Sequence, residues 1–165
     1  MKLAILLILF TSVGLSKQVN ALEVGDLAPN FSLSSMHNEN VVKLSDFAGK
    51  VVYLDFWASW CGPCRTSFPI LSKLYQNYHA QGFEIVSINL DEKPKLAEAF
   101  LQQYPVSFEH LSGFGSEVDK TYGVNAMPTG IFIDAKGKVR LIHRGFKPNH
   151  KPFIEAVLQK LISEV

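Results

Sequence analysis

Hydrophobic and polar positions follow one another along the chain in blocks that predict alternating strands and helices. Residues 51–57 are apolar at every position except Asp55, a pattern typical of a strand buried on both faces, and residues 83–89 form a second, largely apolar run. Between them, over residues 63–81, apolar side chains recur at helical spacing, and Gly82 ends the segment. This order predicts a strand, a helix and a second strand.

The second half of the chain continues the alternation. The pattern there predicts helices over 95–104, 116–122 and 152–162, and strands over 130–133 and 139–144. Strands that alternate with helices in this way are typical of an α/β fold, with a central sheet and helices on both of its faces.

Two short extended pieces come before this α/β region. Residues 28–33 and 41–44 flank a polar turn at 37–40, which predicts a β-hairpin extension at the N-terminal side of the sheet.

The first 21 residues have the pattern of a secretory signal. Lys2 comes before an apolar stretch from Leu3 to about Leu15, and the small residue Ala21 follows at a suitable cleavage position. The stretch is shorter than the roughly 20 residues of a membrane-spanning helix, which favours cleavage over an uncleaved anchor. We therefore expect a signal peptide at 1–21, a single domain at 22–165, and the periplasm of a two-membrane bacterium as the location.

Composition and charge narrow the classes of partner. A chain of 165 residues with 47% apolar content is enough for one well-cored domain. Without Lys2 and Lys17, 14 of the 16 basic side chains remain against 15 acidic ones, so the charge is nearly balanced. Such a surface gives no reason to expect nucleic acid or an anionic membrane as a partner, and we expect neither a cofactor nor a resident metal.

The only two cysteines, Cys61 and Cys64, admit three interpretations. A structural disulfide across two residues closes almost no loop and stabilises little. A closed zinc site needs four ligands, but no second Cys-x-x-Cys pair is present and the five histidines are scattered. A copper-handling module that holds a soft ion without turnover remains an alternative.

The third interpretation, a redox pair, uses the position of the cysteines between a strand and a helix. Cys61 would stand at the helix N-terminus, where unpaired N–H groups and the helix dipole stabilise a thiolate, so it is the candidate nucleophile. Cys64, one turn further on, would remain a thiol until it resolves the mixed disulfide. That step requires a nearby base.

The residues around this pair resemble a known superfamily. The stretch 52–64, Pro69 and the Met-Pro-Thr at 127–129 are similar to the thioredoxin superfamily, and 28–33, 44–50 and 122–134 narrow the resemblance to secreted TlpA/ResA-like thiol-disulfide oxidoreductases. The resemblance covers essentially the whole chain after the signal, and it implies a thioredoxin-like fold with a central mixed sheet.

The resemblance also implies roles for individual residues. Cys61 would be the exposed attacking thiol and Cys64 the buried resolving thiol. Pro128 would be a cis-proline beside the pair, with its neighbouring backbone and Met127 contacting the substrate. Trp60, next to the nucleophile, is a candidate for flanking a substrate groove, although packing is an equally good interpretation.

Two acids are candidates for proton transfer. Asp55 stands where thioredoxins keep a buried acid behind the resolving cysteine, and a carboxyl group in an apolar strand should have a raised pKa. Glu92 aligns with an acid that TlpA/ResA-like members place near the active site, but a solvated loop acid is an open alternative. The chain departs from many of these members at Asp55, where they carry Asn, and at Ser67, where they carry an acid.

The two residues between the cysteines bear on the direction of electron flow. Gly62 and Pro63 offer no charged or imidazole group to stabilise a Cys61 thiolate, which favours a reductase over a thiol oxidant. The resemblance implies a membrane thiol-transfer protein of the DsbD/CcdA type as electron donor and disulfide-bearing secreted proteins, including apocytochrome c, as substrates.

Overall fold

The computed structural model describes residues 21–38 and 40–165. The predicted signal peptide lies outside the described residues apart from Ala21.

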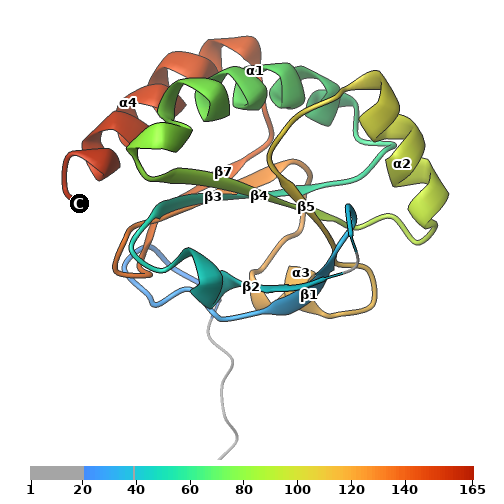
Figure 1. The fold of residues 1–165 in the computed structure, drawn as a ribbon, viewed down its shortest axis with the longest axis horizontal. Coiled ribbons are helices and arrows are strands. Elements are labelled where there is room, and N and C mark those ends of the chain that lie inside the picture. Colours follow the sequence, from blue (N-terminus) through green and yellow to red (C-terminus); the bar gives the residue numbers. More distant parts are fainter. Residues whose placement is uncertain (1–20, 39) are drawn as a thin grey trace, which may run out of the picture.

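A single seven-stranded sheet forms the centre of the fold (Figure 1). Its strands are β1 (Ser32–Ser35), β2 (Val41–Lys43), β3 (Val51–Trp57), β4 (Phe83–Asn89), β5 (Glu109–Ser112), β6 (Thr129–Ile133) and β7 (Val139–Arg144). They lie in the order β2-β1-β5-β4-β3-β6-β7. The sheet is mixed, because β3, β4 and β5 run parallel while the other neighbours pair antiparallel.

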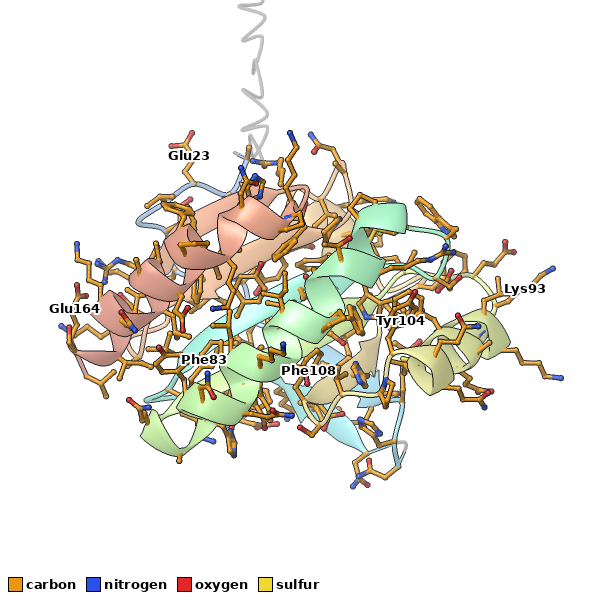
Figure 2. All side chains as sticks on the ribbon, turned by 90° about the horizontal axis from the view of Figure 1, so that it is seen from above. Glu23, Phe83, Lys93, Tyr104, Phe108 and Glu164 are labelled. Atoms are coloured by element: carbon orange, nitrogen blue, oxygen red, sulfur yellow. A yellow bond between two sulfur atoms is a disulfide. The ribbon has the colours of Figure 1, made fainter. Side chains whose placement is uncertain are left out.

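Helices cover both faces of the sheet unequally. They are α1 (Gly62–Tyr78), α2 (Pro94–Gln103), α3 (Val118–Thr121) and α4 (Lys151–Ile162), with 3₁₀ turns η1 (Leu44–Phe47), η2 (His79–Gln81) and η3 (Pro148–His150). The helices α1, α2 and α4 lie on one face, and short α3 lies on the other with the N-terminal segment (Figure 1). Figure 2 looks down on the larger layer, where α1 and α4 lie side by side and α2 stands at the end near Lys93 and Tyr104.

The alternation of β3 distributes its side chains between two hydrophobic cores. Tyr53 and Trp57 belong to the core under α1, α2 and α4, whereas Leu54 and Phe56 belong to the core that includes α3. Because successive side chains of a strand point to opposite faces, Asp55 lies on the same face as Tyr53 and Trp57. This face also carries the two cysteines.

The structure confirms most predicted elements and corrects a few. The strands predicted over 51–57, 83–89 and 139–144 have those bounds, and the hairpin forms, although its first strand begins at Ser32 rather than residue 28. The segment predicted as one helix over 63–81 ends as α-helix at Tyr78 and continues as the turn η2.

The strand β5 was not predicted. Its sequence, Glu-His-Leu-Ser, has neither a run of β-branched residues nor clear alternation. It becomes a strand through its neighbours, pairing with β4 on one side and β1 on the other.

Candidate active site

The two cysteines lie at the junction of β3 and α1, as the redox interpretation predicts. Cys61 is the N-cap residue of α1, and the Cys64 N–H donates to the Cys61 sulfur at 3.2 Å. The two sulfurs are joined in a disulfide, with their Cα atoms 5.3 Å apart. The structure therefore shows the oxidised form of the pair.

In this form the two cysteines differ less in accessibility than predicted. Cys61, expected as the exposed thiol, is only 3% exposed, and Cys64 is fully buried at 0%. Both belong to the core that contains Trp57 and Phe68, and Met127 packs against it. Bonding to the buried Cys64 holds the Cys61 sulfur close to the protein.

Asp55 is the buried acid on this face of the sheet. It is 1% exposed, and neither carboxylate oxygen has a hydrogen-bond partner among the described residues. Desolvation by burial raises the pKa of Asp55 from 3.8 to about 7. A carboxyl group with this pKa can both accept and return a proton near neutral pH.

A tyrosine and a glycine form the wall beside this carboxyl group. Gly130 is the register partner of Asp55 on β6, and a Cβ placed on it would lie 1.8 Å from the Tyr53 hydroxyl oxygen. The Tyr53 hydroxyl thus occupies the space of a side chain at position 130. Burial, and to a lesser degree the charge of Asp55, raises the pKa of Tyr53 well above its usual value.

The Met127–Pro128 peptide bond is cis, as predicted. The Pro128 carbonyl accepts a hydrogen bond from the Gly145 N–H at 2.8 Å, which ties the proline loop to the end of β7. The contact of Met127 and Pro128 with substrate stays a prediction.

The loop after β4 holds the segment in front of the cysteines through Asp91, a residue that the sequence analysis missed. Its buried carboxylate accepts the Ser59 N–H at 2.8 Å, the Ser59 hydroxyl at 2.9 Å and the Asn89 side-chain amide at 2.8 Å. The sequence carried part of this signal, since Asp91 and Glu92 both follow a strand that runs parallel to β3 and so reach the same edge of the sheet, but nothing local distinguishes the two acids. Glu92 is exposed, and its acid–base role stays a prediction.

A chain of polar groups behind Trp57 was also missed. The indole N–H donates to the Ser87 hydroxyl at 3.2 Å, and Ser87 is hydrogen-bonded to Nδ1 of His110. Burial, aided by the nearby His37, lowers the pKa of His110 to about 3, so this imidazole is neutral at physiological pH. This chain of hydrogen bonds positions Trp57. The Trp57 side chain is buried in the core, so it packs inside the protein and is not part of the contact surface.

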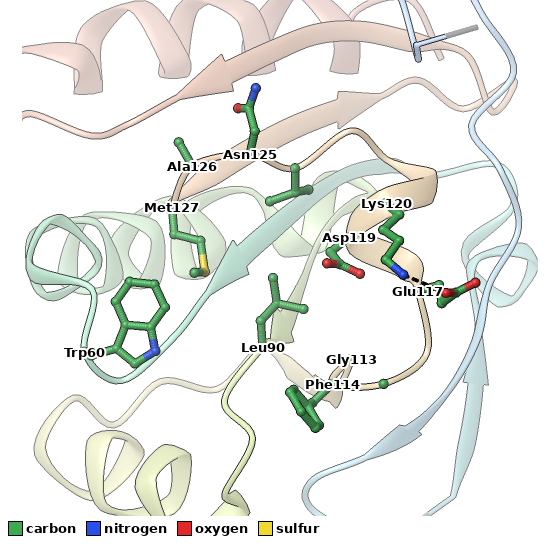
Figure 3. A pocket seen from close by; sticks show the side chains of 12 residues that line it. Trp60, Leu90, Gly113, Phe114, Glu117, Asp119, Lys120, Asn125, Ala126 and Met127 are labelled. Atoms are coloured by element: carbon green, nitrogen blue, oxygen red, sulfur yellow. Dashed lines mark hydrogen bonds and ion pairs between the residues drawn. The ribbon is translucent and has the colours of Figure 1, made fainter. Parts of the chain in front are cut away.

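The two tryptophans therefore have different environments, since Trp60 is 66% exposed. It lines a groove together with Met127, and Figure 3 shows the two side chains close together at one end of it.

The described residues contain neither a cluster of metal ligands nor a membrane-spanning helix. Over 21–38 and 40–165, no three His, Cys, Asp or Glu side chains gather as a metal site. Within the same ranges, every helix is too short or too polar to span a bilayer.

Comparison with known proteins decides the family. The family model Redoxin matches residues 23–158. The chain belongs to the redoxin family. A thiol-disulfide oxidoreductase ResA from Bacillus cereus is 37% identical over 144 residues, which cover 84% of this chain and 83% of the relative. ResA of Geobacillus thermodenitrificans is 34% identical over 165 residues, covering 95% and 94%.

Solved structures agree with this assignment. A Chlorobium tepidum protein assigned as thiol:disulfide interchange protein DsbE has a TM-score of 0.82 at 46% identity, covering 86% of this chain and 99% of its own. A Bacteroides thetaiotaomicron protein has a TM-score of 0.78 at 24% identity, which supports the fold alone. This redoxin is therefore a thiol-disulfide oxidoreductase with a thioredoxin-like fold and a Cys61–Cys64 redox pair.

Proposed function

We propose that this redoxin is a periplasmic reductase of disulfides in secreted proteins, with apocytochrome c among its candidate substrates. The environment of Cys61 is the observation that supports a reductase rather than a thiol oxidant. The helix N-terminus stabilises its thiolate, but the intervening Gly62 and Pro63 add no charge or imidazole to make the reduced form exceptionally stable.

The first chemical step uses Cys61. Its thiolate attacks one sulfur of a substrate disulfide, a new S–S bond forms, and the second substrate sulfur leaves as a thiolate that takes a proton from water. The substrate sulfur that Cys61 attacks lies against the cis-proline loop, which contains Met127 and Pro128.

The second step uses Cys64 and Asp55. The Asp55 carboxylate accepts the Cys64 proton, and the resulting thiolate attacks the Cys61 sulfur. This attack breaks the mixed disulfide and releases the substrate sulfur that Cys61 had attacked, as a thiolate. That thiolate takes the proton that Asp55 received from Cys64, so the carboxylate is regenerated. The substrate gains two electrons and two protons, and the protein is left with the disulfide that the structure contains. Because the pKa of Asp55 is about 7, its carboxyl group can accept and return the Cys64 proton near neutral pH.

A reductase in an oxidising compartment must then be reduced again. A membrane thiol-transfer protein of the DsbD/CcdA type is the proposed electron donor, because it can deliver dithiol electrons across the membrane. Residues 1–21 support the location, since their sequence has the pattern of a secretory signal.

The variant Cys64→Ser tests the proposed exchange. Without the resolving thiol, we expect Cys61 to remain in mixed disulfides with its substrates, which can be isolated without reductant and identified by mass spectrometry. Cys61→Ser is the matched control, because it keeps Cys64 but lacks the nucleophile and should trap almost nothing. If neither variant traps a protein while the wild type binds Cu(I) tightly at one equivalent, the copper-handling interpretation replaces this one.

The reduction potential tests the direction. Equilibration with thiol buffers of known potential should give a value below about −200 mV, as for reducing members of the thioredoxin superfamily. A value near the roughly −120 mV of a strong periplasmic oxidant would reverse the assignment.

A further inference from the structure

A groove of about 640 Å³ opens beside the redox pair. We call it the side groove. It is lined by Trp60 and Met127 at one end, by Glu117 and Lys120 at the other, and by Leu90 and Phe114 between them (Figure 3). Residues 113–120 supply much of its far wall.

Two large aromatic side chains that line the side groove face water. Trp60 is 66% exposed and Phe114 is 55% exposed. Apolar surface left in water next to a reactive centre is typical of an interaction site, and aromatic side chains provide much of the contact energy in such sites. The apolar part of the side groove therefore suits a bulky apolar side chain.

The backbone beneath Phe114 is firmly held. The Gly113 N–H donates to the Asn89 carbonyl at 2.9 Å, and the Ser116 hydroxyl donates to the Gly113 carbonyl at 2.6 Å. A Cβ on Gly113 would lie 2.5 Å from a methyl group of Ile88, so the loop sits directly on the core. The backbone that carries Phe114 is thus held in place, which lowers the backbone entropy lost when a partner packs against this loop.

The far wall carries an excess of negative charge. Glu117 and Lys120 form an ion pair at 2.7 Å, so their charges offset each other. Asp119 lines the same wall, and in the part of the chain that the structure describes its carboxylate has no ion-pair or hydrogen-bond partner. Figure 3 shows Asp119 beside Lys120 on the groove side of α3. A basic side chain would complement this wall.

We infer that the side groove binds an extended segment of the substrate polypeptide that carries a bulky apolar side chain and a basic side chain within a few residues of the reacting cysteine. The apolar side chain packs between Trp60 and Phe114, and the basic one lies against Asp119. An extended chain advances about 3.3 Å per residue, so neighbouring substrate residues reach the side groove while the cysteine is at Cys61. The inference rests on the proposed function, because it names the substrates of that exchange.

Three peptides test this specificity. Each has one cysteine disulfide-bonded to a fluorescent reporter thiol: the parent carries Phe and Lys near it, the second has Ala for Phe, and the third has Glu for Lys. We expect the reduced wild-type protein to release the reporter from the parent about tenfold faster than from the Ala peptide. The parent should also react about threefold faster than the Glu peptide, a preference that about 0.5 M salt removes by screening.

Variants assign the two preferences to their residues. Phe114→Ala should remove the preference for Phe, and Asp119→Lys should reverse the preference for Lys over Glu. The matched controls are Phe153→Ala, at a residue 52% exposed on α4, and Glu23→Lys, at an exposed acid near the N-terminal end of the domain. Both controls should keep the wild-type preferences.

A small uncharged substrate, bis(2-hydroxyethyl) disulfide, separates the two possible failures. If the wild type reduces it but reacts equally with all three peptides, the specificity inference is overturned and the proposed function stands. If the wild type reduces no disulfide, the proposed function fails, and the inference fails with it. Concentration-dependent dimerisation that Phe114→Ala abolishes would assign the side groove to a second copy of the chain and would also overturn the inference.

Discussion

Asp55 is the residue at which stability and function compete most directly. A buried carboxylate without a hydrogen-bond partner destabilises the fold once it ionises, whereas its protonated form is tolerated. The pKa of about 7 expresses this conflict. The carboxyl group whose ionised form destabilises the fold is therefore also the one able to take the Cys64 proton near neutral pH.

Replacing the acid should separate these two effects. Since the folded pKa of Asp55 is raised from 3.8 to about 7, the folded chain retains a proton that the unfolded chain releases, and stability is lost as the pH rises through this range. We therefore expect Asp55→Asn to increase the free energy of unfolding by about 3 kcal/mol at pH 8.5 and by little at pH 4, measured by urea denaturation of the oxidised protein.

The same variant should lose function where it gains stability. Release of a preformed mixed disulfide by Cys64 should be slower in Asp55→Asn and should lose its rise around pH 7. Asp119→Asn, which removes a partly exposed acid, is the control for stability and should leave the pH dependence of unfolding unchanged. Equal stabilisation of Asp55→Asn at pH 4 and pH 8.5 would contradict the assigned pKa.

At the scale of elements, the contact between β3 and β6 shapes the wall beside Asp55. The two strands pair antiparallel with Asp55 opposite Gly130, and the missing side chain at Gly130 is what allows the Tyr53 ring to lie across the strand. Here glycine is needed for close approach, and its backbone flexibility is not the reason for its presence.

A methyl group at position 130 should therefore disturb the pairing of these strands. A Cβ 1.8 Å from the Tyr53 hydroxyl oxygen forces the buried ring to move, and we expect Gly130→Ala to lower the free energy of unfolding by about 2–3 kcal/mol in urea denaturation. Gly62→Ala is the control, because a Cβ there meets no atom within 4 Å.

A double variant identifies the contact responsible. Tyr53→Leu removes the ring, so it should destabilise the Gly130→Ala protein less than it destabilises the wild type. Additive effects of the two changes would show that the methyl group acts elsewhere.

At the scale of the whole molecule, β5 joins the hairpin to the parallel strands and brings His110 into the core. The imidazole is 1% exposed, and its neutral form is bonded to Ser87, which in turn accepts the Trp57 indole N–H. This buried polar chain links β5, β4 and β3 beneath the active-site helix. By burying His110, the strand order makes the stability of the fold depend on acidic pH.

His110 should make the fold sensitive to acid. Because its folded pKa is lowered from 6.5 to about 3, the unfolded chain takes up a proton first, and stability falls as the pH drops below 6.5. We expect His110→Gln to reduce the loss of unfolding free energy between pH 6.5 and pH 4 by about 2 kcal/mol, measured from urea midpoints. An unchanged slope over this range would exclude His110 as its source.

Much of the fold and part of the site follow from local sequence. The apolar runs at β3 and β4, the helical spacing of α1 and the hairpin turn depend on neighbouring residues, and the structure confirms them. The unequal positions of Cys61 and Cys64 at a helix start are local as well, because they depend only on where the strand ends and the helix begins. These features could be predicted from the sequence because each depends on only a few neighbouring residues.

Other features depend on residues that are far apart in the chain. No local pattern marks β5 as a strand, and none shows that Asp91 rather than Glu92 anchors the loop in front of the cysteines. The unpartnered carboxyl group of Asp55 and the room for Tyr53 at Gly130 exist only after β3 and β6 pair. The sequence by itself determined the strand-helix frame and the redox pair, through local periodicity and helix-end chemistry. Only the tertiary structure decided the accessibility, the pKa values and the side groove, because burial and charge depend on contacts between distant segments.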